Sequence, residues 1–125
     1  MAMKVLLSIK PEFVDKIFSG EKKFEFRRVI FKDRSVKTVL VYASAPVQKV
    51  IGEFEIEEIV CQDIETLWKI TQSHAGITYD YFATYFEGKK QGFAIKIKNL
   101  KKFKNAQCIK KDYHLTPPQS FVYVN

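Results

Sequence analysis

Residues 49–60 show the clearest alternation of apolar and polar side chains in the chain, and this pattern limits the fold more than any other. Every second residue from Val50 to Ile56 is apolar or glycine, and glutamates occupy the positions between Gly52 and Ile56 and just beyond. A period of two is typical of a strand with one buried face. Gly52 within it predicts a bulge or a close approach of another backbone.

Further alternating or apolar runs predict about six strands in all, at residues 5–9, 22–30, 38–44, 49–60, 93–98 and 119–124. Three short helices are expected between them, each ending at a glycine; they start near Pro11, Asp63 and Thr78. The lysine-rich segment 99–118 is expected to be irregular, with part of it extending a strand. Strands and helices do not alternate strictly. We therefore predict one α+β domain over residues 1–125, a curled sheet or small barrel with helices at its side.

The charge of the chain favours a polyanionic partner. Lys and Arg number 21 and Asp and Glu 14, which gives a net charge of +7. A surplus of this size on a small domain favours nucleic acid, although a protein that is merely basic would show it too. The densest positive stretch is a set of lysines late in the chain, Lys96, Lys98, Lys101, Lys102, Lys104, Lys110 and Lys111. These side chains either follow a nucleic-acid backbone or form a solubilising surface.

Several classes of protein are disfavoured by what the sequence contains. Cys61 and Cys108 are far apart, and neither histidine has a cysteine at metal-binding spacing, so we expect no metal or other cofactor. No apolar run approaches the roughly 20 residues of a membrane helix, and the apolar patch at 5–9 is too short for a signal peptide. We accordingly expect free thiols, no membrane partner, a cytoplasmic location and, by assumption, a monomer.

The run GEKKFEFRR that begins at Gly20 is the first candidate site. Two phenylalanines in it alternate with Glu25 and Arg27, so the acid and the guanidinium share one face of a predicted strand. The pair either pins the strand or directs hydrogen-bond donors at an anion such as phosphate. Strict alternation places Lys22 on the opposite face, and it meets the pair only if the start of the strand is irregular. A buried amine beside a carboxylate would suit anion binding or general-base chemistry.

The pattern Gly20-x-Lys22-x-x-Glu25-x-Arg27 resembles the GxKxxExR signature of the ASCH family, a branch of the PUA-like superfamily. The preceding LLSIKPEFVDKIFSG is similar to the strand and helix that lead into that signature. The segment VYASAPVQKVIGEFEI is similar to a strand pair of ASCH and of the related EVE domains, and PPQSFVYV also looks typical of the family. The resemblance covers essentially the whole chain.

This resemblance implies a PUA-like β-barrel whose cleft suits RNA or a nucleobase. The residues that it implies for ligand binding lie in the signature or near the ends of strands: Lys22, Glu25, Arg27, Tyr42, Ser44, Ser8, Lys10, Gln119 and Ser120. Tyr42 would stack on a base from the second wall, or would instead fill the core. Lys23 and Arg28 are expected at the rim. Helical spacing favours core packing for Trp68, Tyr81 and Tyr85.

Three functions stay open from the sequence alone. The first is an RNA- or modified-base-binding domain that regulates transcription, translation or RNA modification. The second is a hydrolase with Lys22 and Glu25 as catalytic residues, since some ASCH proteins are amidohydrolases on acylated nucleosides or metal-dependent ribonucleases. An amidohydrolase would need a threonine where this chain has Glu25 and an acid within residues 73–78, where it has none; a ribonuclease role finds Lys22 and Ser120. The third is a protein-interaction module.

Overall fold

The structure is a computed structural model that describes residues 3–125. Along the chain these residues form β1 (Lys4–Ile9), α1 (Pro11–Phe18), β2 (Phe24–Arg27), β3 (Thr38–Ala43), β4 (Lys49–Asp63), α2 (Ile64–Thr71), the 3-10 helix η1 (Gln72–His74), α3 (Tyr79–Tyr85), β5 (Gln91–Gln107), α4 (Ile109–Tyr113) and β6 (Phe121–Val124). The mixed α+β class is therefore as predicted. In this described part, no helix is long and apolar enough to cross a bilayer.

The strands form one sheet in the order β2-β5-β4-β3-β1-β6. β1 and β3 are parallel, and the other neighbouring pairs are antiparallel. Among the described residues no backbone ladder joins the edge strands β2 and β6, so the sheet is open, and of the two predicted forms, a curled sheet or a small β-barrel, the barrel was wrong. The two edges nevertheless come close enough for side chains to connect them, as the site shows.

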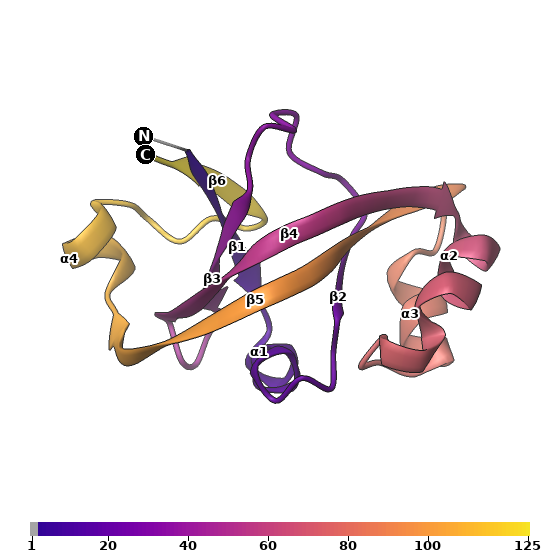
Figure 1. The fold of residues 1–125 in the computed structure, drawn as a ribbon, viewed down its shortest axis with the longest axis horizontal. Coiled ribbons are helices and arrows are strands. Elements are labelled where there is room, and N and C mark those ends of the chain that lie inside the picture. Colours follow the sequence, from indigo (N-terminus) through magenta and orange to yellow (C-terminus); the bar gives the residue numbers. More distant parts are fainter. Residues whose placement is uncertain (1–2) are drawn as a thin grey trace.

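β4 and β5 form a long twisted ribbon that crosses the molecule from the end with α2 and α3 to the end with α4 (Figure 1). The pairing changes register beside Gly52, where the sequence predicted an irregularity. A Cβ atom added to Gly52 would lie 2.4 Å from the carbonyl oxygen of Lys101 and 2.7 Å from the Phe18 ring. Only glycine lets β5 and α1 approach β4 this closely.

The largest differences from the predicted elements lie in two segments. β2 is shorter than the predicted strand at 22–30, because Lys22 and the residues after Arg27 lie outside the ladder with β5. The segment after residue 98 continues β5 to Gln107, as partly expected, but then forms α4, a fourth helix where three were predicted. Cys108 caps α4 by accepting a hydrogen bond from the Lys111 amide, and the left-handed residue that ends it is His114 rather than glycine.

Three apolar clusters fix these elements. The largest lies between α1 and the sheet and includes Val14, Ile17 and Phe54. The second holds α2 and α3 against β2 and β5. The third joins α4 to β1, β3 and β4 and contains the buried Tyr42 beside Ile109. The edge left between α1, α3 and the ends of β1 and β6 is where the candidate site lies.

Candidate ligand-binding pocket

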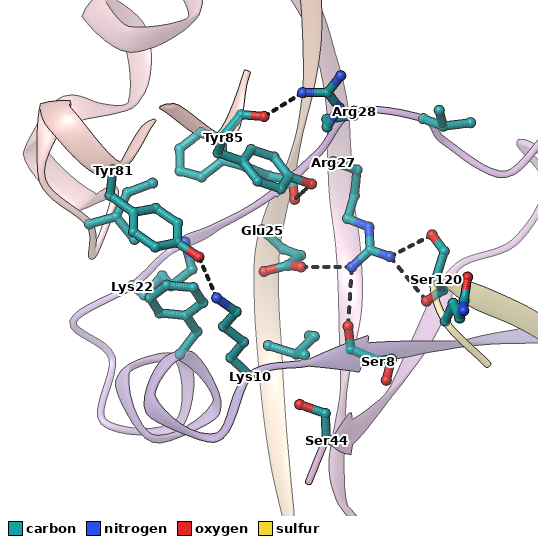
Figure 2. A pocket seen from close by; sticks show the side chains of 16 residues that line it. Ser8, Lys10, Lys22, Glu25, Arg27, Arg28, Ser44, Tyr81, Tyr85 and Ser120 are labelled. Atoms are coloured by element: carbon teal, nitrogen blue, oxygen red, sulfur yellow. Dashed lines mark hydrogen bonds and ion pairs between the residues drawn. The ribbon is translucent and has the colours of Figure 1, made fainter. Parts of the chain in front are cut away.

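A pocket of about 540 Å³ opens between α1, β2, α3 and the chain just before β6 (Figure 2). The structure brings eight of the nine predicted ligand-binding residues to its wall: Ser8, Lys10, Lys22, Glu25, Arg27, Ser44, Gln119 and Ser120. These residues come from both halves of the chain. Their convergence follows from the approach of the two edges of the sheet.

Arg27 spans the gap between β2 and β6. Its Nη2 donates to the carbonyl oxygen and the Oγ of Ser120, at 3.0 and 2.7 Å, and its Nη1 donates to the carbonyl oxygen of Ser8 at 3.3 Å. Nη1 also lies 3.2 Å from Oε2 of Glu25, which confirms that the two side chains touch on one face of the strand. Both side chains are largely buried. The guanidinium thus replaces a backbone ladder between the edges of the sheet.

Lys22 lines the pocket and is only 2% exposed. Its Nζ donates to the carbonyl oxygen of Ala75 at 2.8 Å and lies 4.6 and 5.4 Å from the ring centres of Phe26 and Phe13. It therefore stands on the phenylalanine side, as alternation predicts, yet it lines the same pocket as Glu25 because it precedes β2. Burial lowers the pKa of Lys22 to about 8, against an opposing effect of the Glu25 carboxylate.

Glu25 offers the pocket a hydrogen-bond acceptor. Its Oε2 accepts from Arg27, whereas among the described residues its Oε1 has no hydrogen-bond partner. No buried side-chain oxygen or nitrogen in that part of the chain lacks a partner, so Oε1 is in contact with the pocket space. The pocket therefore presents a cation and a carboxylate oxygen together.

Aromatic side chains of α3 form the facing wall, which corrects the prediction that Tyr81 and Tyr85 fill the core. The Tyr81 hydroxyl accepts a hydrogen bond from Lys10 Nζ at 3.0 Å, across the mouth of the pocket. The Tyr85 hydroxyl donates to the carbonyl oxygen of Phe26 at 3.2 Å. Burial raises the pKa of Tyr85, so this phenol is protonated and donates. Trp68 does pack in the core as predicted, against Phe82.

Tyr42 is placed away from the pocket, and the prediction that it forms the second wall was wrong. It is 2% exposed and packs among Leu6, Leu40 and Ile109 on the face of the sheet that α4 covers. Its neighbour Ser44 does reach the pocket, because β3 ends at Ala43 and the chain turns there. The alternative that the sequence left open, core packing, is the one observed.

The predicted basic residues divide into paired and unpaired groups. Arg28 lies at the rim, but its Nη1 donates to the carbonyl oxygens of Tyr85 and Glu87, at 2.7 and 3.1 Å. Lys96 pairs with Glu57 at 2.9 Å. Within residues 3–125 no ion pair is formed by the remaining members: Lys23, Lys98, Lys101, Lys102, Lys104, Lys110 and Lys111. Lys98 and Lys101 lie opposite Glu55 and Glu53, so the ribbon is less positive than the sequence suggested.

Comparison with known proteins identifies the family. A family described as "Domain of unknown function (DUF365)" matches residues 2–116. The protein named "ASCH domain-containing ribonuclease" from Zymomonas mobilis is 32% identical over 129 residues, which span 97% of this chain and 84% of that protein. The crystal structure of ASCH from Zymomonas mobilis superimposes with a TM-score of 0.87 at 31% identity, over 98% and 87% of the two chains.

The chain belongs to the ASCH family. A more distant relative is a protein of Ureaplasma parvum named "Large ribosomal subunit protein uL22", 28% identical over 125 residues, which are 96% of this chain and 39% of that protein. This chain therefore spans about two fifths of the Ureaplasma relative. The ASCH signature residues Lys22, Glu25 and Arg27 are among the residues that line the pocket.

The resemblance to metal-dependent ASCH ribonucleases raises the question of a metal site in the pocket. The residues that line the pocket do not fit a metal ion held by the protein alone. A hard cation takes six or more oxygen ligands, and a site built by the protein alone has to supply most of them from carboxylate and carbonyl oxygens. The pocket has a single carboxylate, Glu25, and Arg27 already binds one of its oxygens. Across residues 3–125, no group of three or more His, Cys, Asp or Glu side chains could hold a metal ion. Cys61 and Cys108 are free thiols outside the pocket.

The structure also lacks the arrangement that an ASCH amidohydrolase would need. Such an enzyme would need an acid within residues 73–78, where the sequence has none. In this position the carbonyl oxygen of Ala75 accepts the hydrogen bond of Lys22 instead. A carbonyl oxygen cannot accept and release a proton as a carboxylate does.

Proposed function

We propose that this ASCH domain binds single-stranded RNA and takes one nucleobase into the pocket. The observation that carries the proposal is the combination of the Lys22 ammonium and the free Oε1 of Glu25 between aromatic walls. A phosphate bound to Lys22 would place its negative oxygens beside Oε1 of Glu25, which offers them no hydrogen-bond donor. The edge of a nucleobase carries donors and acceptors side by side and can meet both groups.

The size and walls of the pocket support a base as the ligand. Its volume of about 540 Å³ lies within the roughly 300–1,000 Å³ of pockets that hold small ligands. Tyr81, Tyr85 and Phe13 supply rings on which a base can stack, an interaction that contributes about 1–3 kcal/mol for each base. A base must leave a duplex to enter a recess of this kind, which favours single strands and loops.

The backbone of the bound RNA would then lie at the mouth. Lys10 is exposed there and has the neutral Tyr81 hydroxyl as its hydrogen-bond partner, so it can exchange this bond for a stronger one to a phosphate. Beyond the mouth, the unpaired lysines of β5 and α4 would add attraction that does not depend on sequence. We place this binding in the regulation of transcription, translation or RNA modification, and the ribosomal name of the Ureaplasma relative supports an RNA setting.

Fluorescence anisotropy with labelled single-stranded RNA, and with a hairpin of the same composition, tests the proposal at low and physiological salt. We expect the single strand to bind more tightly. Lys22→Met should weaken binding about 10- to 100-fold, the loss of about 1.5–3 kcal/mol for a hydrogen bond to a charged group. Tyr42→Phe is the matched control, because Tyr42 is buried away from the pocket. No binding at low salt, or equal affinity of the Lys22 variant and the wild type, would contradict the proposal.

RNA cleavage is a second candidate, because Lys22 has a pKa of about 8 and the Zymomonas relative is named a ribonuclease. A neutral Lys22 amine could accept the proton of a ribose 2′-hydroxyl as that oxygen attacks the adjacent phosphorus. The bond to the 5′-oxygen then breaks, and this oxygen takes a proton from water. Incubation of end-labelled RNA with the wild type and with Lys22→Met tests this reaction. Intact RNA in both samples, with or without added divalent metal, would contradict cleavage, and RNA binding would be the only one of the two functions still supported.

A further inference from the structure

The backbone of residues 74–77 closes over the Lys22 side chain. Besides the Ala75 carbonyl that accepts from Nζ, Gly76 packs directly on the stem of the lysine. A Cβ atom on Gly76 would lie 2.5 and 2.7 Å from Cβ and Cγ of Lys22, and Gly76 has a φ of +69° that favours glycine. This short segment between η1 and α3 therefore determines where the Lys22 amine points.

Lys16 joins this segment to α1. Its Nζ donates to the carbonyl oxygen of Gly76 at 3.1 Å, and its own carbonyl oxygen accepts from the amide of Lys22 at 3.0 Å. Nζ also lies 3.8 Å from the exposed Glu21 carboxylate. One residue thus contacts both the backbone of Lys22 and the loop that holds its amine. Nothing in the sequence pattern marks Lys16 for this role.

We propose that Lys16 is a positioning residue of the pocket, which holds Gly76 and Ala75 against Lys22 and so keeps the Lys22 amine desolvated and directed at the ligand. This inference rests on the proposed function for its biological meaning. Its geometric part, the control of the Lys22 amine by Lys16, stands on the hydrogen bonds alone.

The charges around Lys22 determine whether removal of the Lys16 side chain raises or lowers the pKa of Lys22. Glu25 on β2 raises the pKa of Lys22 and Lys16 on α1 lowers it, while the segment 74–77 presents a carbonyl group and no acid. Lys10 and the Tyr81 hydroxyl lie at the mouth. Without the Lys16 side chain a like charge is gone and the segment over Lys22 is less tightly held, so more water reaches the amine. Both changes raise the pKa of Lys22.

NMR titration of carbon-13-labelled lysine side chains between pH 7 and 11 measures this effect without any ligand. We expect Lys16→Met to raise the pKa of Lys22 by about 0.5–1, the size expected for one like charge near a partly hydrated group. Lys16→Arg keeps the charge and the donor and should restore the wild-type titration. Lys69→Met is the matched control, because Lys69 pairs with Glu65 on the exposed face of α2. A folded Lys16→Met protein in which Lys22 titrates as in the wild type would overturn the inference.

Gly76→Ala provides a second route to the same result. The added methyl group would collide with the Lys22 stem and push the segment 74–77 away from it. The pKa of Lys22 should then rise although Lys16 is intact. If Lys16→Met does not fold, an unchanged titration in folded Gly76→Ala overturns the inference. RNA binding is measured separately: its pH midpoint should rise with the pKa of Lys22 in each variant. If RNA does not bind at any pH while the titrations shift, the proposed function fails and the role of Lys16 stands.

Discussion

Lys22 and Arg27 are two buried cations five residues apart, and the structure satisfies them very differently. Arg27 has four acceptors, from Glu25, Ser8 and Ser120, which come from β2, β1 and the chain before β6. Lys22 has one, the carbonyl oxygen of Ala75. The guanidinium has a planar fork that binds several acceptors at once, whereas the ammonium is a compact charge on a flexible stem.

This difference separates a cation that maintains the fold from one that is available to a ligand. Arg27 connects the two edges of an open sheet, so its interactions stabilise the folded protein and leave little capacity for a phosphate. Lys22 is desolvated without full compensation, and a ligand that accepts its remaining N–H groups would relieve that strain. The two sites meet at Glu25, which binds Arg27 with one oxygen and faces the pocket with the other.

Removal of the Arg27 fork should have the largest effect. Arg27→Met leaves the Glu25 carboxylate buried without its cation and frees the edges of the sheet at Ser8 and Ser120. We expect the free energy of unfolding to fall by about 3–5 kcal/mol, as when one partner of a buried ion pair is removed. Urea denaturation followed by circular dichroism measures it. The stability of Arg27→Lys should lie between those of the wild type and Arg27→Met. An unchanged urea midpoint in Arg27→Met would show that Arg27 does not join the edges of the sheet.

The charge of Lys22, unlike that of Arg27, should destabilise the folded protein. The fall in its pKa from 10.5 to about 8 corresponds to about 3 kcal/mol of destabilisation at pH 7, at 1.36 kcal/mol for each pKa unit. Lys22→Met removes this charge and keeps the length of the side chain, so we expect stability to rise by up to that amount, less about 1.5–3 kcal/mol for the charged hydrogen bond to Ala75 that is removed. RNA binding should weaken about 10- to 100-fold in the same variant.

The pH dependence of stability checks the sign of this argument. Between pH 8 and 10.5 the unfolded chain keeps the Lys22 proton while the folded protein has released it, so the unfolded state binds more protons and this group makes stability rise with pH. The stability gap between Lys22→Met and the wild type should therefore narrow from pH 8 to 10.5. A gap that is constant with pH would mean that the amine is not strained, and the contrast with Arg27 would disappear.

The sequence predicted the presence of all six strands, although not all of their ends, and it did not predict which elements cover them. Alternation places Leu40 and Tyr42 on one face of β3 and Val39 and Val41 on the other, without saying which face borders a ligand. α4 covers the Tyr42 face, and this five-residue helix has neither an oxygen side chain at its N-cap nor a glycine at its end. Without those signals the helix was not predicted, and the sequence could not decide between the two roles left open for Tyr42, a wall of the pocket or part of the core.

The candidate site was predictable where its residues share one motif and less so where they meet through the tertiary fold. Alternation was enough to place Glu25 beside Arg27. The tyrosines of α3 were missed because Phe82 and Phe86, one position further along the helix, occupy the core-facing stripe and turn Tyr81 and Tyr85 toward the pocket. Closure of the sheet into a barrel depends on whether the edge strands β2 and β6 pair with each other. The side-chain pattern of one strand does not show which distant strand it pairs with.

The lysines of the β4–β5 ribbon should show the smallest effect on stability and the clearest effect of salt. Lys101, Lys102 and Lys104 are exposed and form no ion pair in the described structure, so their joint replacement by glutamine should change the free energy of unfolding by about 0.5 kcal/mol or less for each substitution. If they bind RNA phosphates, the slope of log K against log salt should decrease by about 0.7 for each lysine–phosphate interaction that the substitutions remove.

The same substitutions at Lys69, Lys89 and Lys90 provide the matched control. These lysines are also exposed, and Lys69 pairs only with the exposed Glu65, but they belong to the end of the molecule with α2 and α3 (Figure 1). Affinity for a long RNA should fall in the ribbon variant and not in the control, whereas a trinucleotide that reaches only the pocket should bind both alike. Equal salt slopes in the two triple variants would show that the ribbon acts only through net charge. Recognition would then be confined to the pocket, where Lys22 and Glu25 meet a base.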